Sequence, residues 1–258
     1  MTGEGGEISP RISTIDRPIP RPEILPSRAE LERYRQKPEW YETHSNQEHA
    51  KSKVHGSGHH ARTLVWTGYQ ANLLPADEQA KINKEALFWA ATTHDLGRTG
   101  NFELRELRNF PHHQKAHEER GGEWIRNNWQ LLDPNLSPET VEMIAYLVGH
   151  HGDHGEKMAG APTELRLLIG ADHLEGTRVI RGVDPMRRHL PARLRPFFKP
   201  MSNALRNVIR NRTDSEEVVK LLPIARQFAA KSHQHPNYET YPYTAVFDVA
   251  QKMQLIGD

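Results

Sequence analysis

Residues 91–98 read Ala-Thr-Thr-His94-Asp95-Leu-Gly-Arg98, and they place a histidine beside an aspartate at the predicted end of an apolar helix. The dipeptide alone indicates little. Further histidines and acids, however, recur at helical intervals along the chain: His59, His117, His150, His151 and Asp172. Imidazole nitrogens and carboxylate oxygens are ligands of divalent transition metals. We therefore predict a metal site built from several helices and, with it, a hydrolytic enzyme.

The hydrophobic pattern around this segment predicts an all-α fold. Apolar residues recur at helical spacing, and no β pattern of any length and no internal repeat is present. Ser27 and Ser137 are predicted N-caps, and Pro138 suits the first helical position. The predicted helices cover residues 27–37, 58–74, 81–93, 113–129, 138–150, about 163–179 and 215–231, with a final helix near the C-terminus.

Composition divides the chain into three parts. Residues 1–50 hold a Pro-rich extended arm and a short helix, because the prolines of the run 17–26 cannot continue a helix. Residues 51–190 carry the predicted metal-binding helical bundle. Residues 191–258 form a C-terminal helical extension. Within this scheme, residues 99–111 are expected to be a loop or lid, and residues 181–200 a basic, proline-broken connector.

Bulk composition limits the class of protein. The net charge is +1, which argues against a strongly basic nucleic-acid binder, and nucleic acid is therefore a less favoured partner. The absence of cysteine excludes disulfides and thiolate metal sites. No apolar run reaches the roughly 18 residues of a membrane span, and the first residues lack the pattern of a signal peptide. A cytoplasmic protein is expected. The oligomeric state is not indicated.

The number of ligand candidates exceeds what one tetrahedral zinc ion needs. It suits two divalent transition-metal ions, with Asp95 placed to bridge them. Fe or Mn are the preferred metals, and Ni, Co, Zn and Mg are alternatives. Such a pair can bind a hydroxide and hold a phosphate ester for in-line attack. The arginines within predicted reach of the phosphate, and hence candidates for a catalytic role beside Asp95, are Arg62, Arg98 and Arg178.

Five segments carry a resemblance to the HD-domain superfamily of metal-dependent phosphohydrolases. They are HGSGHHART (55–63), HDLGR (94–98), HEERGG (117–122), VGHH (148–151) and ADHLEGTR (171–178). The resemblance covers roughly residues 50–180, in the order H…HD…H…H…D. It implies His59, His94, Asp95 and Asp172 as ligands of one metal, and His117 and His150 as the mark of the two-metal subset. His151 is a further ligand candidate. His55 and His60 compete with His59, and His113 competes with His117.

The leading hypothesis is thus a phosphohydrolase or phosphodiesterase that uses metal-activated hydroxide on a phosphate ester, with a nucleotide as the preferred substrate. The resemblance also admits a mixed-valent di-iron oxygenase, because ligand type does not decide the redox chemistry. A third hypothesis is a non-catalytic module that senses a metal or another ligand. The sequence does not separate His150 from His151 as a metal ligand.

Overall fold

The computed structural model describes residues 20–42, 55–98, 112–153, 155–189 and 216–258. Every regular element among them is helical, and their only β contact is an isolated bridge between Ser27 and Gly257. The prediction of an all-α fold is therefore confirmed. The helices are α1 (Arg28–Glu32), α2 (Glu39–Glu42), α3 (Ser57–Ala71), α4 (Ala76–Gln79), α5 (Lys84–Thr93), α7 (His112–Asn128), α8 (Pro138–His150), α9 (Thr163–His189), α11 (Glu216–Gln234) and α12 (Pro242–Lys252).

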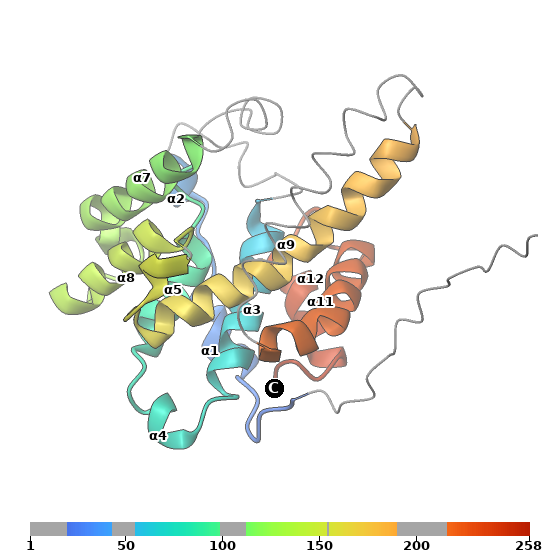
Figure 1. Cartoon of the computed structure of the whole chain (residues 1–258), viewed down its shortest axis with the longest axis horizontal. Coiled ribbons are helices and arrows are strands. Elements are labelled where there is room, and N and C mark those ends of the chain that lie inside the picture. Colours follow the sequence, from blue (N-terminus) through green and yellow to red (C-terminus); the bar gives the residue numbers. More distant parts are fainter. Residues whose placement is uncertain (1–19, 43–54, 99–111, 154, 190–215) are drawn as a thin grey trace, which may run out of the picture.

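Helix α5 packs against α3, α8 and α9, so its C-terminal end lies among other helices (Figure 1). Helix α7 packs on α8, while the long α9 packs on α3 and α11, and α12 also contacts α3. Apolar side chains fill the space between these helices, among them the fully buried Trp66, Leu87, Phe228 and Phe247. Since α5 is buried on most sides, the residues at its end are buried as well.

The helix boundaries follow local capping chemistry. Ser137 accepts a hydrogen bond from the backbone N–H of Thr140, with Pro138 in the first turn of α8, as predicted. Asn83 caps α5 in the same way through the N–H of Ala86. Two predicted boundaries are wrong by more than one turn. The first helix was expected to reach Lys37 but ends at Glu32. Helix α9 was expected to end near Val179 with a connector from residue 181, but it continues to His189. The single internal proline of this stretch did not end the helix.

The N-terminal segment lies along α3 and meets the C-terminus. The Tyr69 hydroxyl donates to the carbonyl of Pro20. The N–H of Gly257 donates to the carbonyl of Pro26, and the Arg28 guanidinium donates to Asp248 of α12 at 2.7 Å. Residues on both sides of the predicted bundle therefore contact each other as well as the bundle. The predicted division of the chain at residues 50 and 190 stays a prediction, and most of the Pro-rich arm and the loop at 99–111 lie outside the described residues.

None of the helices that the structure describes is both long enough and apolar enough to cross a membrane.

A close backbone approach fixes α7 against the end of α5. A Cβ placed on Gly97 would lie 1.8 Å from the carbonyl oxygen of His117 and 2.6 Å from the backbone nitrogen of Gly121. A Cβ on Gly121 would meet Val148 of α8 at 2.7 Å. Because the atoms near Gly97 are backbone, no side chain can move away to make room. This contact sets how near His117 comes to Asp95.

We expect Gly97→Ala to destabilise the protein by about 1–3 kcal/mol, the usual cost of overpacking, because α7 must shift. Gly149→Ala is the matched control: nothing lies within 4 Å of its added Cβ, and it lies inside α8. This control is expected to leave the stability unchanged or raise it by up to about 1 kcal/mol. Urea unfolding of both variants measures the difference. Equal stabilities would show that the Gly97 contact is not tight.

Candidate metal centre

A first group of donor atoms comes from α3, α9 and the end of α5. The Nε2 atoms of His59 and His94 lie 3.1 Å apart, and Asp172 Oδ1 lies 3.2 Å and 3.7 Å from them. Asp95 Oδ2 lies 3.7 Å from His59 Nε2 and 3.8 Å from His94 Nε2. Ligands about 2.1 Å from one ion are separated by about 3.0 Å at right angles and about 3.4 Å at tetrahedral angles. The observed spacings fit one ion with little rearrangement.

A second group lies on the other side of the same carboxylate. His117 Nε2 of α7 lies 3.4 Å from Asp95 Oδ1, and His151 Nε2, just after α8, lies 3.7 Å from that oxygen. The potential ligand atoms of these residues all lie within 4.8 Å of one another. Asp95 therefore turns Oδ2 towards one pair of histidines and Oδ1 towards another. A bridging carboxylate between two ions has this arrangement.

Two ligand candidates are oriented by the helices that they end. His94 caps α5, and its Nδ1 lies 3.0 Å from the carbonyl oxygen of Ala91. His151 caps α8, and its Nδ1 lies 2.7 Å from the carbonyl oxygen of Val148. A carbonyl can only accept, so Nδ1 carries the proton in both rings. Each Nε2 is left with its lone pair, which is directed into the cluster and suits a metal.

Several buried donor atoms in this cluster have no hydrogen-bond partner. They include both ring nitrogens of His117 and Nδ1 of His59. His117 is 2% exposed and His59 is 4% exposed, so water does not readily replace the missing partners. Buried polar groups are normally paired. Orphaned nitrogens beside paired carboxylates therefore fit a site that holds cations.

The protonation states suit metal binding. Burial, followed by the charge of Arg98, lowers the pKa of His117 to about 3, so this ring is neutral at pH 7. Although burial opposes it, Arg98 and the neighbouring histidines keep the pKa of Asp95 well below its usual value. Asp172 is kept ionised in the same way by His59 and His94. In the metal-free protein the Asp172 and Glu175 carboxylates outweigh the effect of burial and raise the pKa of His59, so a metal ion competes with a proton for this ring.

Asp95 is also held by two groups at the edge of the cluster. The Arg98 guanidinium donates to Oδ1 at 2.6 Å, and His55 Nδ1 donates to Oδ2 at 2.8 Å. His55 and Asp172 are partly exposed, with side-chain exposures of 26% and 31%. Among the described residues, the edge with His55 and Asp172 is thus a partly exposed side of the cluster. The sequence had left His55 open as a competitor of His59; the structure places both beside Asp95.

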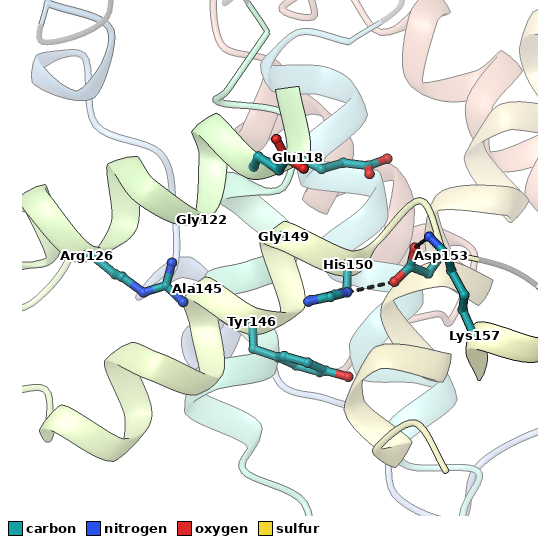
Figure 2. Close-up of a pocket in the computed structure, with 10 residues that line it drawn as sticks. Glu118, Gly122, Arg126, Ala145, Tyr146, Gly149, His150, Asp153 and Lys157 are labelled. Carbon is teal, nitrogen blue, oxygen red and sulfur yellow. Dashed lines mark hydrogen bonds and ion pairs between the residues drawn. The ribbon is translucent and has the colours of Figure 1, made fainter. Parts of the chain in front are cut away.

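His150 is not brought to the cluster. Its Nδ1 donates to Asp153 at 2.7 Å, and its ring lies against that of Tyr146 in a groove between α7 and α8 (Figure 2). The phase of α8 explains the difference, because His151 follows the buried Ile144, Leu147 and Val148 at helical spacing. His150 follows the exposed Tyr146 instead. The structure thus places His151, and not His150, among the potential ligand atoms around Asp95.

Arg62 is not placed to meet a substrate either. It is 0% exposed, and its Nε donates to Glu175 at 2.8 Å, on the Nδ1 side of the His59 ring. The predicted phosphate contact of Arg62 is therefore replaced by a buried ion pair. Arg98 lies at the cluster, but its Nε is bound to Asp95. Arg178 lies in α9, and its side chain is outside the described residues.

Several residues without a predicted role lie next to the ligand candidates. Glu175 Oε2 lies 3.6 Å from His59 Nδ1. Gln36 donates an amide hydrogen to His60 Nδ1 at 2.7 Å, and His60 in turn packs edge-on against His94. Glu175 has a visible signal, since it lies one turn after Asp172 on the same helix. No pattern in the sequence pointed to Gln36, which lies far from the ligand motifs.

Comparison with protein-family models matched the HD domain over residues 57–177. This part of the chain is an HD domain, and its buried His/Asp cluster is consistent with the HD metal site. The HD domain is typical of the metal-dependent phosphohydrolases. No curated protein and no solved structure matched the chain in the corresponding searches. The resemblance expected from the sequence is thus confirmed at the level of the family.

The adjacent histidines of α8 provide a matched pair of variants. We expect His151→Ala to remove one of two bound ions, because it deletes one of the few donors near Asp95 Oδ1. His150→Ala should leave the metal content unchanged, since that ring faces the groove. Elemental analysis of the purified, Mn²⁺-loaded variants measures the stoichiometry. The assignment fails if the two variants lose the same amount of metal.

The buried neutral His117 makes the metal-free protein sensitive to acid. In the unfolded chain this histidine titrates near its ordinary pKa of 6.5, whereas in the folded protein it titrates near 3. Between these values the unfolded state binds more protons, so stability is lost as the pH falls below 6.5, by at most about 1.4 kcal/mol per pH unit. Urea unfolding of chelator-treated protein at pH 6.5 and pH 5 should show a smaller loss for His117→Gln than for the wild type. The same loss in both proteins would contradict the buried neutral ring.

Proposed function

We propose that the protein is a two-metal phosphohydrolase or phosphodiesterase whose substrate is a phosphate ester, with a nucleotide as the preferred candidate. The HD domain over residues 57–177 supports the reaction class. The observation that carries the two-metal proposal is the position of Asp95, whose two oxygens face separate histidine pairs. A mononuclear site would not need His117 and His151 at the second oxygen.

In this proposal His59, His94, Asp172 and Asp95 Oδ2 hold one ion, and His117, His151 and Asp95 Oδ1 hold the other. When bound, such a pair activates water and neutralises charge on phosphoryl oxygens. Arg98 keeps Asp95 ionised and in place through its 2.6 Å contact. As the arginine nearest the ligands, Arg98 is also the cation that we assign to an incoming phosphate.

The charge of the cluster supports an anionic substrate only after metal binding. Among the described residues here, the carboxylates of Asp95, Asp172 and Glu175 outnumber the guanidiniums of Arg62 and Arg98. With His59 protonated as well these charges cancel, so the metal-free site has no excess of positive charge to attract a phosphate. Two divalent cations make the local charge positive and make a phosphate ester a complementary ligand. Activity should accordingly depend strictly on added metal.

The test is hydrolysis of bis-(p-nitrophenyl) phosphate and of a nucleotide panel by protein loaded with Mn²⁺ or Fe²⁺. We expect Asp95→Asn to lower kcat/KM by more than about 100-fold. Mutating a residue that only hydrogen-bonds to a metal ligand already lowers metal affinity or activity by about 10–100-fold. Asp153→Asn makes the same chemical change in the groove beside His150 and should retain activity within about threefold. Both variants should be checked for folding by circular dichroism.

The same experiment distinguishes the proposed hydrolase from a di-iron oxygenase, which the same ligands also admit. Stoichiometric iron with a mixed-valent EPR signal, oxygen consumption and no ester hydrolysis would replace the proposed hydrolase. A protein that is fully loaded with metal but turns over no phosphate ester with any of the metals would also reject it.

A further inference from the structure

We propose that Tyr238, which lies outside the HD domain, is a positioning residue for the ion held by His59 and acts through Arg62 and Glu175. The inference rests on the proposed metal centre but not on hydrolysis. Tyr238 lies between α11 and α12, well beyond the matched residues 57–177. It therefore makes the C-terminal segment a part of the metal site.

The network begins at the contact between His59 and Glu175. When Nε2 of His59 binds a metal, the ring proton is on Nδ1, and this atom needs an acceptor. Glu175 Oε2 lies 3.6 Å from Nδ1, which is longer than a hydrogen bond, and Nδ1 has no other hydrogen-bond partner. Glu175 is 0% exposed. Its carboxylate is therefore the acceptor that orients the ring once the metal is bound.

Glu175 is in turn paired with Arg62. The same Oε2 accepts a hydrogen bond from Arg62 Nε at 2.8 Å, and both side chains are fully buried. A buried carboxylate is stable as an ion only while its partner remains in place. Arg62 lies on α3 one turn after His59, so it fixes Glu175 of α9 relative to the ligand.

Tyr238 contacts the guanidinium of Arg62. Arg62 Nη1 donates to the Tyr238 hydroxyl at 2.8 Å, and the guanidinium carbon lies 5.6 Å from the centre of the tyrosine ring. A Cβ on Gly58, the residue before His59, would lie 2.1 Å from the same hydroxyl. The hydroxyl therefore occupies space that α3 leaves open only at a glycine. The Tyr238–Arg62–Glu175 network thus connects the C-terminal segment to the surroundings of His59.

The network predicts a selective loss of metal affinity. In Tyr238→Phe, Arg62 loses an acceptor and can move, so the hold on Glu175 and His59 weakens. We expect the affinity for one of the two ions to fall 10–100-fold, the range found when the partner of a ligand is changed. Chelator competition with Mn²⁺-loaded protein, followed by elemental analysis, measures this affinity without any substrate.

Tyr69→Phe is the matched control, because Tyr69 is also a buried tyrosine whose hydroxyl makes one hydrogen bond, to Pro20 near the far end of α3. Thermal unfolding of the metal-free proteins should show that both variants fold and lose similar stability. Only Tyr238→Phe should bind metal more weakly. In a His151→Ala background, where the ion beside His59 is expected to remain, Tyr238→Phe should lower the affinity of that remaining ion by the same factor.

The inference is overturned if Tyr238→Phe holds both ions as tightly as Tyr69→Phe, or if it weakens only the ion beside His117. A wild-type protein that binds no metal would overturn both proposals. Weaker metal binding in Tyr238→Phe, together with a wild type that hydrolyses no phosphate ester, would leave the positioning role intact and reject the hydrolase alone.

Discussion

The burial of the Asp95 carboxylate is the constraint on which the rest of the site depends. A carboxylate that is 1% exposed is costly unless charges and hydrogen bonds compensate it. Arg98 and His55 supply hydrogen bonds, and imidazoles from α3, α5, α7 and α8 surround its two oxygens. The positions of α3, α7 and α8 relative to the end of α5 must therefore be fixed. The tight contact between Gly97 and α7 fixes one of these positions, because it limits how near His117 can come to Asp95.

The helix ends also determine which ring atom faces the cluster. His94 and His151 both follow the last residue of a helix, where the final carbonyls have no N–H partner within the helix. Each imidazole satisfies a carbonyl that lies three positions before it in the sequence, and so presents Nε2 to the carboxylate. The same hydrogen bond thus completes the helix and selects the tautomer that binds metal. His117 lies inside α7 and has no such partner, which is consistent with its orphaned nitrogens.

Much of the fold and of the buried His/Asp cluster could be predicted from the sequence because both depend on local pattern. Periodicity located α3, α5, α7 and α8, and the HD dipeptide with its neighbouring motifs indicated His59, His94, Asp95, His117 and Asp172. The sequence did not separate His150 from His151, and only the buried positions of α8 in the structure place His151 in phase with Ile144 and Val148. Arg62 was misjudged for a different reason. Its spacing from His59 shows that it is near the site, but not that Glu175, more than a hundred residues later, pairs with it.

The contributions of Gln36 and Tyr238 could not be predicted, because both depend on packing between segments that are distant in the sequence. Gln36 reaches His60, and Tyr238 reaches Arg62, so each contacts α3 on a residue next to or one turn from His59. The two segments also meet each other where Arg28 pairs with Asp248 and Gly257 pairs with Pro26. A helix that carries a ligand among buried charges cannot shift without breaking these contacts. We therefore infer that the parts of the chain on either side of the HD domain restrict the position of α3, and that the geometry of the His/Asp cluster depends on them as well as on its own residues.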